Sequence, residues 1–296
     1  MNHMKISTLF SILLFFSFVS KAQETSPSFL LYSYNMNMLN PAYAGTTEKS
    51  ELNIGFRRQS LELQDDPVTQ FLSYSKALKN NIGIGISLIN DKIFISRQTD
   101  VAIDVSYKLQ IARNSHLYFG LKAGGAIYEI DFNSLGVDDP LFSGNENTFN
   151  PLLGVGAYLK GERYFLNVSV PNLLLSEVQK PRLGTNDIYS ESVVEKLHLY
   201  FGGGYRFSIN ESIDLTPSVF SRVVTDEQML LDVSAMADFS NKVEASLTYR
   251  LDTSIIASVM LKLIDTTYFG YGYEAPSSDY SAIAVGTHEF MVRFKF

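Results

Sequence analysis

The 296-residue chain contains no cysteine and no tryptophan. The lack of cysteine excludes disulfides, thiolate metal sites and a lipid-modified N-terminal cysteine. It also suits a chain that crosses an oxidising periplasm, because no thiol can mispair there. Basic residues are in the minority, with 24 Lys and Arg against 31 Asp and Glu and a formal net charge of −7. Without a basic stripe, this composition excludes nucleic acid as an expected partner.

Long apolar runs are also scarce. Beyond residue 22 the sequence has no run of about 18 apolar residues, which predicts that the mature chain has no transmembrane helix. The apolar run at residues 6–19 follows a weakly basic lead and precedes Ser20-Lys21-Ala22, with small residues at both positions that a signal peptidase reads. This pattern predicts a secretory signal peptide over residues 1–22 and a mature chain that begins near Gln23.

Helical periodicity is weak along the mature chain, and a period of two takes its place. In the last segment the apolar residues at positions 290, 292, 294 and 296 share one face, whereas Arg293 and Lys295 share the other. This alternation is typical of a strand with one apolar and one polar face. It recurs in about 14 segments, and a final strand that ends on an aromatic residue, Phe296, is typical of the closing strand of an outer-membrane barrel.

The connections between these segments alternate in length. Short connections lie at 79–81, 112–114, 161–162, 209–211, 240–242 and 265–266, and most of the longer ones lie at 61–67, 90–97, 129–149, 171–195, 223–227 and 275–282. Short turns at one end and longer loops at the other are typical of transmembrane barrels, in which the turns face the periplasm and the longer loops face outward. An even number of strands then predicts that both termini lie on the periplasmic side.

Charged residues sharpen this prediction, because they fall on the face opposite the aliphatic and aromatic residues. A Lys or Arg on the lipid face at mid-membrane costs about 2–4 kcal/mol, whereas a lumen-facing one costs little. The charged positions on the polar face are Asp104, Lys108, Lys122, His198, Arg206, Asp214, Asp232, Asp238, Glu244, Arg250, Lys262, Arg293 and Lys295. A soluble all-β sandwich, which alternates in the same way, is the alternative.

The sequence therefore predicts an all-β fold, an antiparallel transmembrane β-barrel of about 14 strands in the outer membrane. The predicted organisation is a signal peptide at 1–22, an N-terminal periplasmic or lumen segment at 23–49, and the barrel at 50–296. Outer-membrane lipid is then an expected partner of the outer face.

Motifs near the start of the mature chain carry a family resemblance. They are Asn40-Pro41-Ala42-Tyr43-Ala44-Gly45, Arg57-Arg58-Gln59 and Pro67-Val68-Thr69, followed by the glycine-alternating segment 82–88 and the loop 136–142. Together they resemble the PorP/SprF family of type IX secretion system outer-membrane proteins of the Bacteroidetes. The resemblance implies a non-enzymatic component of the secretion and gliding machinery. It implies two kinds of partner: secretion components on the periplasmic side, and a secreted surface protein or adhesin bound through its C-terminal sorting domain.

The residues expected to contact a partner are Asn40, Pro41, Tyr43, Gly45 and Arg57. Asn-Pro initiates turns and glycine can adopt a positive φ, so the 40–45 string can be a structural turn that leads into the first strand. Alternatively, it folds into the lumen or lies at the periplasmic mouth. Glycines on the inward parity leave a similar choice, since they either relieve crowding where the wall bends or make room for a plug. Arg57 is on the polar parity, where lumen carboxylates are its expected partners.

Other functions leave weaker signals. An independent pore or small-solute transporter is the main alternative, and the sequence does not decide whether the lumen is open or plugged. The chain has no H-E-x-x-H and no G-x-S-x-G motif, although a barrel hydrolase needs only a Ser and a His that meet in space. The acidic loop at 131–150 has oxygen ligands of the kind that calcium prefers but no EF-hand spacing, which favours a solvated loop. No cofactor is expected.

Overall fold

A computed structural model describes residues 28–61, 66–132, 145–174, 177–183, 188–194, 196–225, 229–277 and 284–296. The predicted signal peptide and most of the acidic loop at 131–150 lie outside these ranges. The described chain begins with three short helical turns, η2 (Tyr32–Tyr34), α2 (Met36–Leu39) and η3 (Pro41–Tyr43). None of the helices among the described residues is long and apolar enough to span a membrane.

Strands make up most of the remaining regular structure in the described ranges. They are β1 (Glu51–Leu61), β2 (Val68–Ala77), β3 (Ile82–Ile93), β4 (Ser96–Ala112), β5 (Ser115–Asp131), β6 (Asn145–Lys160), β7 (Tyr164–Val170), β8 (Glu177–Leu183), β9 (Ile188–Val194), β10 (His198–Tyr205), β11 (Phe207–Asn210), β12 (Ile213–Val224), β13 (Leu230–Phe239), β14 (Val243–Arg250), β15 (Ser254–Ile264), β16 (Thr267–Pro276) and β17 (Ala284–Lys295).

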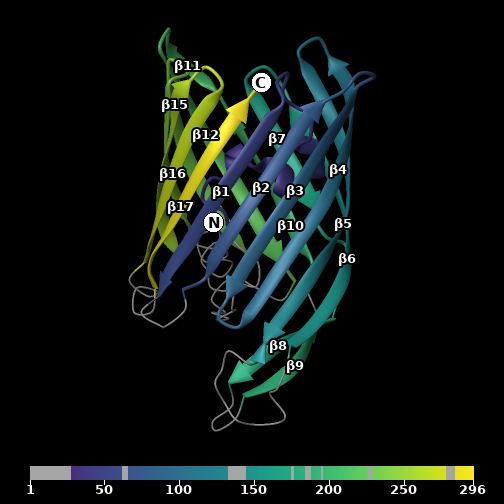
Figure 1. Ribbon diagram of the computed structural model, residues 1–296. Helices are drawn as coiled ribbons and strands as arrows, with labels where there is room; N and C mark the ends of the chain where they lie inside the picture. Colours follow the sequence, from purple (N-terminus) through teal and green to yellow (C-terminus); the bar gives the residue numbers. More distant parts are fainter. Residues whose placement is uncertain are drawn as a thin grey trace, which may run out of the picture.

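All strands except β8 and β9 join in one closed antiparallel barrel (Figure 1). β1 pairs with both β2 and β17, so the first and last strands close the wall. β10 and β11 are successive parts of one wall strand, since both pair with β12, and β10 also pairs with β7. The barrel therefore has 14 strands, which confirms the number predicted from the alternation.

The burial pattern is the inverse of that in a soluble protein. Leu121 is 63% exposed, whereas Lys122, the next residue, is 3% exposed. Likewise Ile103 is 57% exposed and Asp104 is completely buried. A soluble sandwich would bury the aliphatic residues and expose the charges. Apolar residues that face outward around a polar interior define a barrel for a lipid surrounding.

The two ends of the barrel differ in their connections. At the short-turn end, where the C-terminus lies in Figure 1, tight turns join the strands. Two of these turns carry consecutive residues with positive φ, Asn80 (61°) with Asn81 (64°) and Ser240 (55°) with Asn241 (56°). Such pairs match the twist of two-residue hairpins, and asparagine tolerates this conformation. The long-loop end bears the connections at 132–144 and 171–197.

Three loop predictions at the long-loop end need correction. The predicted loop at 90–97 is a hairpin, because β3 continues to Ile93, β4 starts at Ser96, and Phe94 turns the chain with a φ of 56°. Strands β5 and β6 also extend into the predicted loop at 129–149, and the predicted loop at 171–195 contains the paired strands β8 and β9. Beyond the apolar band the strands continue through polar residues, and their backbones pair without any alternation of apolar and polar side chains. The sequence pattern therefore did not predict these extensions.

Candidate functional site

The interior of the barrel is occupied by the chain's own N-terminal part. We call residues 28–46 the lumen segment; in Figure 1 its purple helices lie within the wall. Most of its side chains are buried, including Leu31, Asn35, Asn40, Ala42 and Ala44, each with an exposed fraction of 0%. Helices of three or four residues do not form alone in water, so the surrounding wall must hold them in place.

The wall supplies hydrogen-bond donors to the backbone of the lumen segment. Side chains from five strands donate to its carbonyl oxygens: Asn53 to Tyr34 (3.2 Å), Lys122 to Asn37 (3.3 Å), Ser169 to Leu39 (2.8 Å), Ser106 to Ala44 (2.5 Å) and Lys160 to Thr46 (2.8 Å). Buried backbone carbonyls need partners, and here lumen-facing side chains provide them. The donors come from β1, β5, β7, β4 and β6, so the segment is held from many sides.

The 40–45 string folds for local reasons. The Oδ1 atom of Asn40 accepts a hydrogen bond from Ala42 N (2.9 Å), and Pro41 occupies the first turn of η3, where its missing N–H costs nothing. The Nδ2 atom of Asn40 donates to Ala157 O (3.0 Å), which ties this cap to β6. Gly45 has a φ of +68°, and its N–H donates to Ser75 Oγ on β2 (2.8 Å). The string thus turns the chain and anchors it to the wall.

Inward glycines form the socket for this string. A Cβ atom on Gly83 would overlap Ala44, one on Gly120 would overlap the backbone of Pro41 and Ala42, and one on Gly156 would overlap the side chain of Asn40. Other inward glycines have a different role. A Cβ atom on Gly124 or Gly202 would meet wall backbone. The first three glycines therefore make room for the lumen segment, and the last two relieve crowding against the wall itself.

The other half of the lumen segment is held by a buried carboxylate. Glu289 on β17 is completely buried and accepts hydrogen bonds from Leu30 N (2.7 Å, Oε2) and Leu31 N (3.2 Å, Oε1). Arg57 is the residue directly opposite Glu289 in the pairing of β1 with β17, and it is also buried. A carboxylate that binds two adjacent N–H groups fixes the chain direction at this point.

Ion pairs stabilise the wall behind the segment. Lys122 Nζ lies 2.8 Å from Asp104 Oδ1, and both side chains are buried. Arg293 pairs with Glu51 next to the segment, and the Arg293 guanidinium lies 5.7 Å from the centre of the Tyr34 ring. Burial, together with the Glu51 carboxylate, raises the pKa of Tyr43 to about 12, so this hydroxyl stays neutral.

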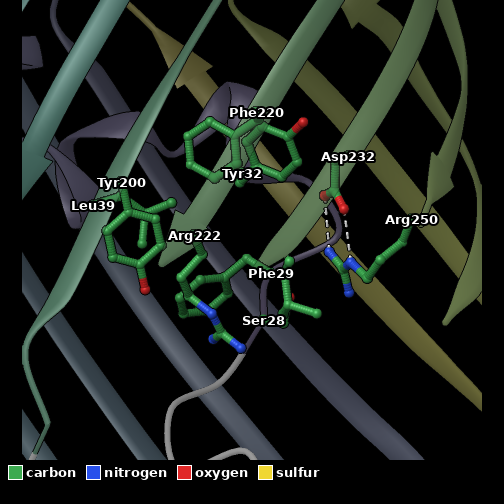
Figure 2. A pocket seen from close by; sticks show the side chains of 10 residues that line it. Ser28, Phe29, Tyr32, Leu39, Tyr200, Phe220, Arg222, Asp232 and Arg250 are labelled. Atoms are coloured by element: carbon green, nitrogen blue, oxygen red, sulfur yellow. Dashed lines mark hydrogen bonds and ion pairs between the residues drawn. The ribbon is translucent and has the colours of Figure 1, made fainter. Parts of the chain in front are cut away.

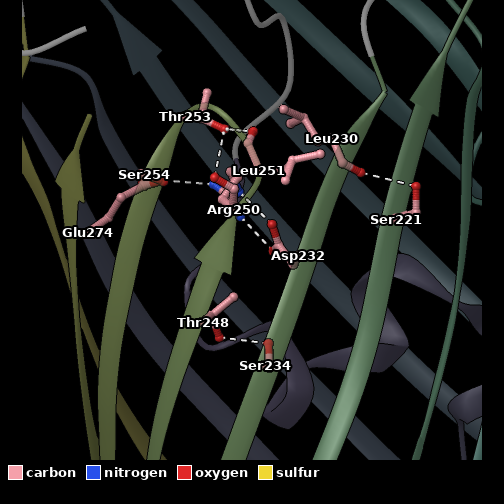
Figure 3. Close-up of polar contacts among 10 residues, drawn as sticks. All are labelled: Ser221, Leu230, Asp232, Ser234, Thr248, Arg250, Leu251, Thr253, Ser254 and Glu274. Carbon is pink, nitrogen blue, oxygen red and sulfur yellow. Dashed lines mark hydrogen bonds and ion pairs between the residues drawn. The ribbon is translucent and has the colours of Figure 1, made fainter. Parts of the chain in front are cut away.

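A second polar network lies on the side of β13 to β16 (Figure 3). Arg250 binds both carboxylate oxygens of Asp232 (2.8 and 2.9 Å) and Glu274 Oε1 (2.9 Å). Ser254 Oγ also donates to Glu274 (2.6 Å). Bidentate arginine–carboxylate pairs fix side-chain geometry, so this side of the lumen is rigid.

A small pocket lies between this network and the start of the lumen segment (Figure 2). Ser28, Phe29 and Tyr32 line it from the segment, and Tyr32 stacks on Phe220 of β12 with ring centres 4.5 Å apart. The described residues include no group of three or more His, Cys, Asp or Glu side chains arranged to hold a metal ion.

The structure brings four of the five predicted site residues together. Asn40, Pro41, Tyr43 and Gly45 lie in the short-turn half of the lumen, whereas Arg57 lies in the other half, opposite Glu289. The contacts seen for Asn40 and Gly45 are with the barrel itself; contact with a partner stays a prediction. Sequence reasoning missed Glu289 and the Asp104–Lys122 pair as anchors. The signal that the sequence offered for these anchors was a charged residue at an inward-facing position in the middle of a strand.

Fold and site together define this molecule as an outer-membrane-type β-barrel whose lumen is filled by its own N-terminal segment. The chain belongs to the PorP/SprF family: the sequence profile described as "Type IX secretion system membrane protein PorP/SprF" matches residues 21–294. Family and fold together support a location in the outer membrane. No curated protein shows significant sequence similarity to the chain.

Solved structures share the fold at very low identity. The chain is similar to the CymD monoaromatic hydrocarbon channel, with a TM-score of 0.54, 9% identity, and coverage of 94% of this chain and 95% of that chain. It is also similar to a TodX monoaromatic hydrocarbon channel, the deltaS2S3 mutant, with a TM-score of 0.53, 10% identity, and coverage of 88% and 94%. At such identity the similarity concerns the fold alone.

Proposed function

We propose that this chain is a non-enzymatic outer-membrane component of the type IX secretion and gliding machinery that binds a surface protein and helps to export or anchor it. Membership of the PorP/SprF family supports the machinery. The single observation that favours binding over conduction is the filled lumen, because the carbonyls of residues 34–46 are tied to at least five strands of the wall.

Two ends of the barrel would serve two partners. The connections at the long-loop end, chiefly 132–144 and 171–197 with the hairpin of β8 and β9, would engage the C-terminal sorting domain of the exported protein. The short-turn end would face secretion components in the periplasm. In this arrangement the filled lumen keeps the outer membrane sealed while the loops hold their cargo. Cleavage of residues 1–22 by a signal peptidase is part of the same proposal.

The alternative is an independent pore or small-solute transporter. Its support is the shared fold with hydrocarbon channels, which says nothing about solutes for this chain. A pore must open a continuous path, and here residues 28–46 would first have to leave the lumen. The filled lumen therefore favours the machinery over the pore.

The test is a gentle detergent pull-down of the tagged chain from its native outer membrane, followed by mass spectrometry. We expect a large surface protein with a C-terminal sorting domain, periplasmic secretion components, or both. An unrelated tagged barrel from the same membrane is the control for nonspecific capture. Recovery of the barrel alone, with robust conductance in planar bilayers, would refute the proposal in favour of the pore.

A matched pair of variants separates the two ends. Replacing residues 175–195 by a short Gly-Ser linker should release the surface protein and leave periplasmic components bound. Inserting the same linker in the turn Leu251–Thr253, at the same end of the barrel, should release neither. Equal loss with both variants would indicate damage to the barrel instead of loss of a binding loop.

A further inference from the structure

Basic residues gather on one side of the mouth at the short-turn end. They lie on β4, β5 and β6, in the β4–β5 and β6–β7 turns, and between β10 and β11. We call this set the basic arc; its members are Lys108, Arg113, His116, Lys160, Arg163 and Arg206. The chain as a whole carries a net charge of −7, so this local excess of positive charge runs against its composition.

Hydrogen bonds join the elements of the arc into one continuous surface. Asn114 in the β4–β5 turn donates to Glu162 in the β6–β7 turn (3.0 Å), and Ser115 and Tyr164 are hydrogen-bonded at 2.9 Å. Arg206 N donates to Arg163 O (2.6 Å), which connects the β6–β7 turn to the β10–β11 junction. The cations are therefore fixed near one another by the backbone.

The positive charges of the arc are only partly compensated, since Glu162 in the β6–β7 turn lies among them and accepts a hydrogen bond from Asn114. Within the described parts of the chain, Lys108, Arg113, Arg163 and Arg206 form no ion pair with a carboxylate. Lys160 lies directly opposite His116 in the pairing of β5 with β6. Arg163 and Arg206, which are joined through their backbones, place two permanent positive charges close together, and this favours the binding of a negatively charged group there.

The opposite side of the mouth carries charges of both signs, with Lys242 and Lys262 near three carboxylates. Asp214, Asp238 and Glu244 lie opposite one another on β12, β13 and β14. The mouth thus has one side with an excess of positive charge and one side of mixed charge. Such a division orients a charged partner as well as attracting it.

Side-chain direction distinguishes a protein partner from lipid. Lys108 and Lys160 share the inward parity with the buried residues Asp104 and Tyr158, so their side chains line the opening instead of the outer wall. Headgroups of the surrounding leaflet reach the outer wall. A soluble partner beneath the barrel reaches the opening.

We propose that the basic arc is the docking surface for an acidic periplasmic protein. This inference rests on the proposed function and specifies where, and by what chemistry, the periplasmic partner binds. The partner presents carboxylates to Lys108 at the opening and to the arginines at positions 113, 163 and 206, and binding weakens with salt because these arginines are exposed.

The test places a photo-crosslinking residue, p-benzoylphenylalanine, in the native cell at Asn114 within the arc or at Thr266 in the β15–β16 turn as the matched control. We expect an adduct with an acidic periplasmic protein at Asn114 and none at Thr266. The triple variant Arg113→Glu, Arg163→Glu, Arg206→Glu should reduce this adduct about tenfold or more. The equal charge change in Lys49→Glu, Lys242→Glu, Lys262→Glu should leave it intact.

Several outcomes overturn the proposal. An adduct that survives reversal of the arc, an adduct with lipid alone, or no adduct at Asn114 would each do so. Heat-dependent mobility in detergent gels checks that every variant forms a barrel. If the wild-type pull-down still recovers secretion components while arc reversal changes nothing, the docking surface is wrong and the proposed function stands.

Discussion

The two halves of the lumen segment are held by different means. From Asn40 to Thr46 the backbone lies directly against glycines of the wall, so close backbone contact determines its position together with side-chain hydrogen bonds from the wall. From Phe29 to Leu39 the segment is held by side chains, among them the Glu289 carboxylate and the ammonium of Lys122. A socket made of backbone cannot adapt, whereas side chains can move or change protonation. The comparison suggests a fixed half at the short-turn end and a half that can be released at the long-loop end.

The largest expected effect lies where the two halves meet. Asp104→Asn removes the partner of buried Lys122, whose ammonium also binds Asn37 O. Leaving a buried charge unpaired costs about 3–5 kcal/mol, which should lower the urea midpoint of barrel unfolding in detergent. The double variant Asp104→Asn, Lys122→Met should recover much of this loss. If the double variant is no more stable than Asp104→Asn, the unpaired charge of Lys122 is not the cause of the lost stability.

The next prediction tests the fixed half. Gly120→Ala puts a Cβ atom into the backbone of Pro41 and Ala42, which cannot shift. The cysteine-free chain allows a single Thr46→Cys reporter, at a site 6% exposed, to be labelled with a maleimide. We expect labelling to accelerate about a hundredfold, because overpacking of about 3 kcal/mol ejects this half.

Gly272→Ala is the matched control for that substitution. Its Cβ atom would lie 3.1 Å from Leu30 Cβ in the other half, a tight contact instead of the overlap with backbone that Gly120→Ala would create. Labelling of Thr46→Cys should then change by less than about twofold, because a 3.1 Å contact is relieved by a shift of a few tenths of an ångström and lies in the other half of the segment. Equal acceleration by both glycine variants would remove the distinction between the halves.

A smaller effect is expected in the half that can be released. Glu289→Ala leaves Leu30 N and Leu31 N without their acceptor, at a cost of about 1–3 kcal/mol. A Ser28→Cys reporter should label about tenfold faster, while Thr46→Cys labels as before. If both reporters accelerate together, the segment moves as one body.

The smallest predicted effect concerns the cap of η3. Asn40→Ala removes the acceptor for Ala42 N and the donor to Ala157 O, and caps of this kind contribute about 1 kcal/mol. Asn40→Asp keeps the acceptor and loses the donor. Thr46→Cys labelling should therefore rise about fivefold in Asn40→Ala and less in Asn40→Asp; a larger rise in Asn40→Asp would contradict the capping role.

Sequence alone predicted the barrel wall better than the position of the lumen segment inside it. Alternation fixes which side chains face inward, so it located Asp104, Lys122 and Arg250 on the lumen face and predicted 14 strands. The turn residues Asn80 and Asn81 marked a hairpin that the structure contains. These features depend on residues that are close together in the sequence, so a local sequence pattern can predict them.

The site is non-local, which is why the sequence could not supply it. Leu30 meets Glu289 across 259 positions, and Ser106 meets Ala44 across 62. No periodicity connects residues at such separations. Glycines on the inward parity did raise the possibility of a plug, but only the structure separates Gly120, which faces the segment, from Gly124, which faces the wall.

The central claim is that residues 28–46 fill the lumen and close it. The most direct test is the single-channel conductance in planar bilayers of the mature chain and of a variant lacking residues 24–45. We predict that the mature chain is nearly silent and that the deletion opens large, stable conductance steps in a barrel that is still folded. Equal conductance in both proteins would contradict the account.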